Sequence, residues 1–246
     1  MALAVMTPPN KWTSGEVTKL IVQSGTLKRA LTETAVAALM AKGSILSFSK
    51  GTLILQRGEQ MPRFFVLLSG TARLAAHTMH GREFISMFLE PGNFWGVHPC
   101  LDEVGESHDA LAQTDVQVLA VPAQNLRDLM WENREIQEAL ISLLCARLRM
   151  AVDVAEQFVT WTPRARLAWR VLAMAKSHGN EAIETGQTDI PVSQEALASM
   201  INLSRQRTNI LLKEMQAEGL LSVEYGRLRV LDLHGLQALL EDPTTR

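Results

Sequence analysis

No segment limits the possible folds of this chain more than the one between Ser193 and Met215. Ser193 is a favourable helix N-cap, and the residues after it tolerate or favour a short helix. Asn202 follows, one of the few non-glycine residues that adopt a left-handed turn comfortably. Ser204 then caps a second helix that runs through Met215 toward Gly219. This spacing predicts a helix-turn-helix, a motif whose second helix lies in the major groove of DNA.

The start of the second predicted helix carries side chains that suit contacts with DNA. Arginine can bond guanine bidentately, and glutamine or asparagine can do the same for adenine. We therefore expect base contacts from Arg205 first, followed by Gln206 and Asn209. Contacts with phosphates are expected from their neighbours Ser204, Arg207, Thr208 and Lys213. Ser193 and Gln194, at the first helix, complete the predicted set, and an ordinary helical hairpin with a polar end is the alternative.

The residues after this motif predict a β-hairpin. Apolar residues at 220–223 and 228–231 flank Tyr225-Gly226-Arg227. The hairpin would make a winged helix-turn-helix, with Arg227 and Arg229 placed to meet phosphates. The string LSRQRTNILLKEMQAEGLL resembles the recognition helix and wing entry of the Crp/Fnr family of bacterial transcription regulators. Where that family often has a second arginine, this chain has Ile210, at the start of the apolar side of the helix. We therefore expect it to read a DNA sequence other than the best-known site of the family.

The pattern of the N-terminal half is different. Short helical pieces between Gly15 and Lys42 place Leu31, Val36 and Leu39 on one face. After them come short apolar or alternating segments, separated by glycine turns: Ser44–Phe48, Thr52–Leu55, Phe64–Leu68, Thr71–Ala75, Phe84–Phe88 and Val116–Val121. Such spacing predicts an antiparallel sandwich or jelly roll.

The same segments carry a second resemblance. LQRGE, FFVLLSG, HGRE and LEPGNFWG follow one another as in the cyclic-nucleotide-binding roll of the Crp/Fnr regulators. With the C-terminal match, the resemblance covers about residues 45–232. It implies an α+β protein with an N-terminal antiparallel β jelly roll, a long dimerisation helix and a C-terminal winged helix-turn-helix.

A long helix is predicted from Asn133 to about Trp161, with two apolar stripes. One has the spacing of a coiled-coil seam and is the predicted dimer interface: Ile141, Leu144, Leu148, Ala151, Ala155 and Phe158. The other is expected to pack against the β roll: Ile136, Leu140, Leu143, Met150 and Val154. A core helix inside a monomer is the alternative. Thr162-Pro163 starts a new helix, so the predicted parts are a sensor domain at 1–125, the dimerisation helix at 126–161 and the DNA-binding domain at 162–246.

The effector is expected not to be cyclic AMP bound in the usual way of the family. The resemblance implies a carboxylate soon after Gly96 and an arginine followed by a hydroxyl residue later in the loop. Here Val97 and His98 follow that glycine, and the arginine position aligns with His108, followed by Asp109. A threonine–serine pair of the long helix is replaced by Ala151-Val152. The predicted effector pocket is more apolar, and its residues are Trp95, Val97, His98, His108, Asp109, Leu111, Leu148, Ala151 and Val152.

Other functions have weaker support in the sequence. A net charge of -2 and a pI near 6.3 give no general basic signal, but a dimeric reader of DNA needs only a local basic surface. Catalytic constellations such as HExxH are absent from the sequence, so we do not expect an enzyme. A single cluster merits a test as a metal or catalytic site: His98, Cys100, Asp102, Glu103 and His108. Its spacing is not that of a usual zinc site, and no metal is expected.

A haem-based gas or redox sensor of the same fold is the alternative function. His77, His98, His108 or Cys100 would then supply the axial ligand, and the cofactor stays open. The two cysteines, Cys100 and Cys145, cannot hold a usual iron–sulfur cluster and do not form a disulfide framework.

The sequence also predicts where the protein works and what it binds. It has no apolar run long enough to span a membrane, and its first residues lack the pattern of an export signal, so cytoplasm is expected. The expected partners are a second copy of the chain, a palindromic DNA operator and an unknown small-molecule effector, and RNA polymerase is left open. A change in the β roll would alter how two long helices pair, and so reposition the recognition helices.

Overall fold

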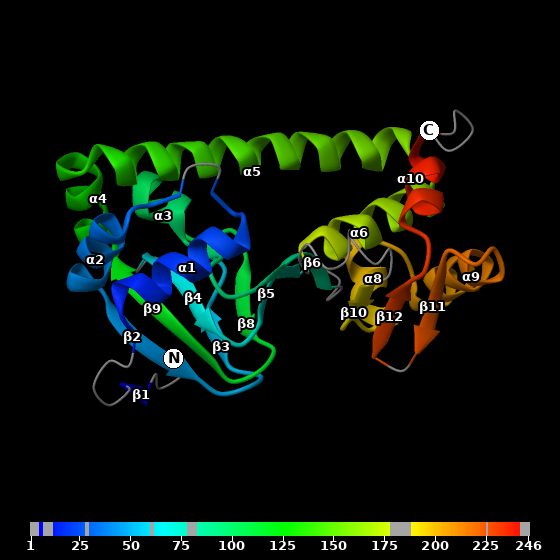
Figure 1. Cartoon of the computed structure of the whole chain (residues 1–246), viewed down its shortest axis with the longest axis horizontal. Helices are drawn as coiled ribbons and strands as arrows, with labels where there is room; N and C mark the ends of the chain where they lie inside the picture. The colour runs from blue at the N-terminus through cyan, green and yellow to red at the C-terminus, as the bar shows by residue number, and fades with distance from the viewer. Residues whose placement is uncertain are drawn as a thin grey trace. The chain divides into compact units, whose positions relative to one another are not determined.

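The computed structural model describes residues 5–6, 12–27, 30–59, 62–77, 83–177, 188–224 and 226–241. The chain separates into two compact units. The first comprises residues 1–78 and 85–149, and the second comprises residues 79–84 and 150–246. The division falls within the long helix α5 (Arg134–Thr160), which is the longest green helix in Figure 1.

Two antiparallel sheets make up the β domain. The first has the order β1 (Val5–Met6), β2 (Ser44–Phe48), β9 (Val116–Pro122), β4 (Arg63–Ser69) and β7 (Phe94–Trp95). The second has the order β3 (Leu53–Leu55), β8 (Asp109–Ala112), β5 (Ala72–His77) and β6 (Glu83–Leu89). The six predicted strands match β2 to β6 and β9, with ends that differ by up to two residues. The predicted antiparallel β domain is therefore confirmed.

The interior strand β4 explains how the two cores of this unit are separated. Successive side chains of a strand point to opposite faces. Phe64 thus packs into a cluster shared with the helices, where its ring stacks on Phe94 at 5.5 Å, and Phe65 packs between the sheets, where it stacks on Trp95 at 4.9 Å. Both faces of β4 are covered, which is why it reads as a continuous apolar run.

Helices cover the outer face of the first sheet (Figure 1). They are α1 (Ser14–Ser24), α2 (Glu33–Lys42), α3 (Val97–Asp102), α4 (Ala123–Glu132) and the N-terminal half of α5. Ile136, Leu140 and Leu143 of α5 are buried in this cluster, as predicted. Leu31, Val36 and Leu39 join them from the N-terminal segment.

Two of the six residues of the predicted seam make contacts within the chain, and the seam itself stays a prediction. Leu144 packs against the cluster shared with the helices, and the ring of Phe158 contacts Phe84 and the Arg166 guanidinium. Four large apolar side chains are exposed instead along one side of the helix: Ile141 (50%), Leu148 (67%), Val152 (57%) and Val159 (86%). Together with the exposed Cys145 and Ala155 they repeat at alternating steps of four and three residues, and we call these six residues the exposed stripe. Met150, predicted to pack on the β roll, is also exposed.

The second unit contains the helix-turn-helix. Its elements are α6 (Pro163–Ser177), β10 (Thr188–Ile190), α8 (Gln194–Met200), α9 (Arg205–Ala217), β11 (Leu221–Glu224), β12 (Arg227–Val230) and α10 (Leu233–Glu241). The strands form one sheet in the order β10-β12-β11. The polar sequence at 177–189 predicts a loop; residues 188 and 189 belong to β10, and 178–187 lie outside the described residues. Among the described helices, none is long and apolar enough to cross a membrane.

Candidate functional site

The helix-turn-helix depends on two capped helix starts. The Ser193 hydroxyl accepts a hydrogen bond from the Ala196 backbone N–H at 3.1 Å, at the start of α8. The Ser204 hydroxyl accepts one from the Arg207 N–H at 3.2 Å, at the start of α9. Asn202, between the helices, has a φ of 54°, the left-handed conformation that the sequence predicted. Each serine cap is worth about 0.5–2 kcal/mol relative to alanine, so the caps fix where both helices begin.

One side of α9 presents polar side chains to solvent. Arg205, Gln206 and Arg207 are exposed in the first turn, Asn209 is partly exposed, and Lys213 is exposed one turn later. The opposite side holds Leu211, Leu212 and Met215 in the core of the unit. The exposed set contains cations and amides that can bond base edges or phosphates.

Two residues of α9 depart from the prediction. Thr208 was expected at a phosphate, but it is fully buried and its hydroxyl donates to the Ser204 carbonyl at 3.1 Å. Ile210 was assigned to the apolar side, but 44% of it is exposed. Helical spacing contained the signal, since residues 208, 211, 212 and 215 follow the i, i+3, i+4, i+7 pattern of one buried face.

The wing has a third strand that the sequence analysis did not predict. β10 pairs with β12 through its whole length, with Asp189 opposite Arg229 in the register. Arg229 donates from Nε to Asp189 Oδ1 at 2.6 Å and from its terminal nitrogen to Oδ2 at 3.1 Å. Arg227 donates to the same Oδ2 at 3.3 Å. Both arginines that were expected to meet phosphates are therefore held by one carboxylate, and we call this group the wing clasp.

The wing clasp is an exposed electrostatic group. The Arg229 guanidinium, by donating to Asp189, holds the pKa of that carboxyl below its usual value, and Arg227 adds to the effect. The same contact raises the pKa of Arg229. Exposed pairs are screened by solvent and salt and contribute little to stability. The wing clasp does change the charge that the wing offers to a polyanion, because Asp189 neutralises one of the two positive charges of Arg227 and Arg229.

The structure places the predicted effector residues in several different surroundings. Trp95 lies in the core between the sheets, where its ring stacks on Phe65, and Val97 lies in the cluster shared with the helices. Leu148 and Val152 are more than half exposed, and Ala151 is exposed as well. The apolar effector pocket stays a prediction.

A buried polar cluster lies where the loop after Gly96 leads into β8. Glu106 is 6% exposed, and its Oε2 atom has no hydrogen-bond partner among the described residues. Its Oε1 accepts from the Ser107 N–H at 2.8 Å and lies 3.4 Å from His98 Nε2. His98 comes from the short helix α3 (Val97–Asp102), which follows Gly96. That glycine has a φ of 76°, and a Cβ there would lie 2.1 Å from the Arg63 carbonyl oxygen.

Basic side chains approach the same carboxylate. Burial lowers the pKa of His108, against the opposing effect of Glu106, while His98, Arg57 and Arg147 lower it further. Burial also lowers the pKa of Arg147, which donates to the Phe94 carbonyl. Sequence analysis missed Glu106 and Arg147 as site residues. The charge of Glu106 in a glycine-bounded loop gives no sign of burial, because glutamate is almost never buried unless it is paired.

Asp109 is already engaged. Its Oδ1 accepts from the Arg57 backbone N–H at 2.8 Å, and its Oδ2 lies 3.1 Å from His77 Nδ1. His108 Nδ1 lies 2.8 Å from the Ser107 hydroxyl. Leu111, the remaining predicted residue, is opposite Arg73 and Leu53 in the sheet and is partly buried.

The proposed haem and metal ligands can be placed individually. Cys100 is fully buried, and burial raises the pKa of its thiol to about 12. Its thiolate form is therefore scarce near neutral pH. Cys145 is exposed on α5. Within the described ranges, no group of three or more His, Cys, Asp or Glu side chains could hold a metal ion.

Two protein families match separate parts of the chain. Residues 45–133 match the cyclic nucleotide-binding domain, and residues 165–239 match the Crp-like helix-turn-helix domain.

Individual relatives cover most of the chain. A CRP-like cAMP-activated global transcriptional regulator of Mycobacterium tuberculosis is 23% identical, over 77% of this chain and 85% of that protein. The transcriptional regulator SdrP of Thermus thermophilus is 26% identical, over 80% and 94%. The solved structure of FixK2 from Bradyrhizobium japonicum matches with a TM-score of 0.71 and 19% identity, over 80% of this chain and 96% of that one.

A ligand-binding β domain followed by a long helix and a helix-turn-helix defines a class, the DNA-binding transcription regulators, which are not enzymes. The chain belongs to the Crp/Fnr family of this class, with its cyclic nucleotide-binding domain and its Crp-like helix-turn-helix in the family's order.

Proposed function

We propose that this regulator reads DNA through the first two turns of α9. The observation that supports this is the capped start of the helix, where Arg205, Gln206 and Arg207 are exposed together. N-terminal residues of a recognition helix contact base edges in the major groove. Arg205 suits guanine, and Gln206 and Asn209 suit adenine. The exposed Ile210 adds an apolar surface that suits a thymine methyl group.

We infer that the active form is a homodimer paired along the exposed stripe of α5. The stripe has the alternating spacing of four and three residues that a two-stranded coiled coil requires. Burying it removes apolar surface from water at about 25 cal/mol per Å². A two-fold dimer would present two α9 helices to half-sites about 34 Å apart, and so would read a palindromic operator. In this division of labour, residues 1–125 sense, 126–161 pair and 162–246 read DNA.

We propose further that the effector is not cyclic AMP bound through a phosphate-binding arginine. The M. tuberculosis relative is a cAMP-activated regulator, whereas the residues of this chain favour another ligand. The loop after Gly96 holds the buried carboxylate Glu106 close to His98 and His108. A buried carboxylate repels a cyclic phosphate, and a ligand that offers an N–H or O–H donor to the free Oε2 atom suits it better. Such a ligand would act through its different affinities for two arrangements of the dimer.

A regulator whose partner is the chromosome works in the cytoplasm. Selection of bound fragments from genomic DNA would give the operator, and fluorescence anisotropy would then measure affinity. Arg205→Ala should cost about 1–3 kcal/mol and relax preference at one base position. Lys213→Ala, the matched control on the same helix, should weaken binding evenly across sequences. An Arg205→Ala protein with parental affinity and preference would contradict the assignment of α9.

A further inference from the structure

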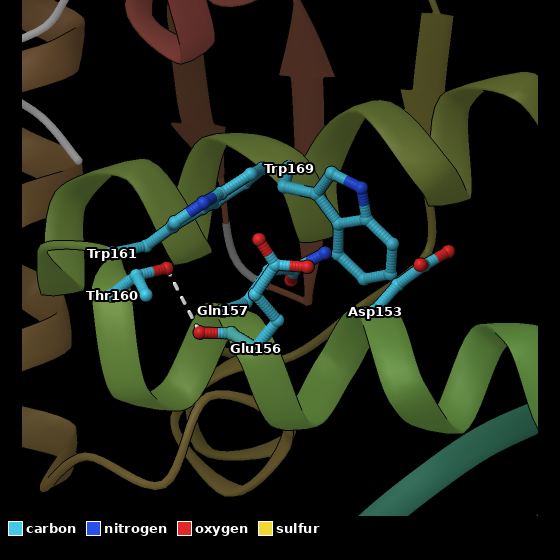
Figure 2. Close-up of a pocket in the computed structure, with 6 residues that line it drawn as sticks. All are labelled: Asp153, Glu156, Gln157, Thr160, Trp161 and Trp169. Atoms are coloured by element: carbon cyan, nitrogen blue, oxygen red, sulfur yellow. Dashed lines mark hydrogen bonds between the residues drawn. The ribbon is translucent and has the colours of Figure 1, made fainter.

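A cavity of about 460 Å³ lies in the second unit, between the end of α5 and α6. Six residues line it: Asp153, Glu156, Gln157, Thr160, Trp161 and Trp169. Figure 2 shows the Trp161 and Trp169 indoles on two sides of it, with the Glu156 carboxylate between them. None of these residues belongs to the DNA-reading surface or to the Glu106 cluster.

The lining has the chemistry of a site for a cation. Its formal charges are two carboxylates, Asp153 and Glu156, and neither forms an ion pair with another described residue. The face of an indole ring attracts a cation within about 6 Å of the ring centroid. Carboxylates and indole faces therefore act in the same direction on an organic cation and against an anion.

Gln157 gives an independent sign that the cavity is built for a ligand. The residue is 7% exposed, and its side-chain amide makes no hydrogen bond to any described residue. The amide lines the cavity without a protein partner among the described residues, so it is free to bond a ligand. Its oxygen can accept a hydrogen bond from a ligand hydroxyl or ammonium group.

Arg170 limits what the ligand can be. Its guanidinium carbon lies 5.2 Å from the centroid of the Trp169 ring, so that indole already serves one cation. A ligand that uses the opposite face meets some repulsion from Arg170. Trp161 has no such neighbour among the described residues, and it should supply the larger part of the attraction.

We propose that this cavity binds a small organic cation, an ammonium ion that carries apolar substituents. The carboxylates neutralise its charge, the indoles cover its apolar groups, and Gln157 accepts from a hydroxyl on the ligand. Within the described residues, the absence of a three-ligand His, Cys or carboxylate group disfavours a metal ion. The inference does not depend on the proposed effector or on the proposed operator.

The position of the cavity gives such a ligand a means of control. Its walls come from α5 and from α6, which the turn at Trp161-Thr162 connects. A bound cation would hold the end of the long helix to the first helix of the DNA-binding domain. Gln157 lies about 160° around α5 from Val159 of the exposed stripe, so its side chain points away from a helix paired along the stripe.

Calorimetric titration of the full chain with choline and tetramethylammonium tests the proposal. The neutral carbon isostere of choline, 3,3-dimethylbutan-1-ol, has the same shape without the charge. We expect saturable binding of the cations, and binding of the isostere weaker by about threefold to thirtyfold, the range of cation–π contacts from exposed to desolvated sites.

Variants locate the binding. Asp153→Asn and Glu156→Gln should each weaken choline about fivefold, the effect of one unit charge at about 4 Å in water. Both side chains are exposed, so neither change threatens folding. Glu138→Gln on the same helix should have no effect, and Arg205→Ala should keep choline binding while it loses operator preference. Failure of both cations to bind, equal affinity for the isostere, or indifference to both carboxylate variants would overturn the proposal.

Discussion

Asp189→Asn should strengthen DNA binding, because it opens the wing clasp without changing the shape of residue 189. Asp189 accepts two hydrogen bonds from Arg229, at 2.6 and 3.1 Å, and one from Arg227 at 3.3 Å. The clasp therefore carries one net positive charge in place of two. Asparagine can keep one hydrogen bond through its side-chain oxygen but removes the negative charge. The wing then offers about one more positive charge to the phosphates.

The salt dependence of binding gives the expected size of this effect. The logarithm of the binding constant falls with the logarithm of salt concentration, with a slope of about -0.9 per neutralised phosphate. One additional contact makes the slope steeper by about 0.9. Between 50 and 200 mM salt, the advantage of Asp189→Asn over the parent should therefore shrink by about 3.5-fold. The gain should be similar for operator and unrelated DNA, because phosphate contacts carry no base information.

Fluorescence anisotropy of both proteins over a salt series measures the slope directly. Glu224→Gln is the matched control: Glu224 acts on Arg229 through its charge, but no hydrogen bond joins it to the clasp. If both variants steepen the slope equally, the general field of the wing is responsible and the clasp is not. An unchanged slope in Asp189→Asn would show that Arg227 and Arg229 do not meet phosphates.

Three further outcomes are expected. Leu148→Glu places a charge in the exposed stripe, where pairing would bury it, so light scattering should report monomers. Met150→Glu, which is off the stripe on the same helix, should stay dimeric. A dimeric Leu148→Glu protein would exclude this interface. Calorimetry should find cyclic AMP and cyclic GMP weaker than about 100 μM, near -5.5 kcal/mol, and tighter binding would refute the argument from Glu106. Burial lowers the pKa of His108, so the unfolded chain binds a proton at this imidazole more tightly than the folded chain does. The free energy of unfolding should therefore fall as the pH drops below the ordinary histidine pKa of about 6.5. His108→Asn should narrow the difference in Tm between pH 5 and pH 8, and an unchanged difference would contradict this.

The elements that sequence analysis found are those whose signal is local. The strand β4 is a long apolar run, and the two helices of the DNA-reading motif carry serine caps that bond as expected. The missed strands have little local signal. β7 has two residues, β10 has three and β8 has four, and each pairs with a neighbouring strand that supplies its hydrogen bonds. α10 is a different case, since Leu236 is buried in a periodic segment that the analysis passed over.

The dimer seam shows a limit of periodicity. Residues 141, 144, 148, 151, 155 and 158 satisfy alternating steps of three and four, and so do 141, 145, 148, 152, 155 and 159. The two registers require different side chains of α5 to be free of contacts within the chain. Leu144 is taken by the core of the β domain, and Phe158 is taken by Phe84 and Arg166. Since those contacts join residues distant in sequence, spacing alone could not choose between the registers.

In the loop after Gly96, the carboxylate that the sequence singled out is not the one that the fold leaves unsatisfied. Sequence analysis placed Asp109 where the family has a hydroxyl residue, but that carboxylate accepts from the Arg57 N–H and lies beside His77. The carboxylate that remains unsatisfied is Glu106, three residues earlier in the same loop. Its burial depends on packing around Arg147, which arrives from α5. The charge pattern of the loop could not show which carboxylate lacks a partner, because that depends on packing with residues distant in the sequence.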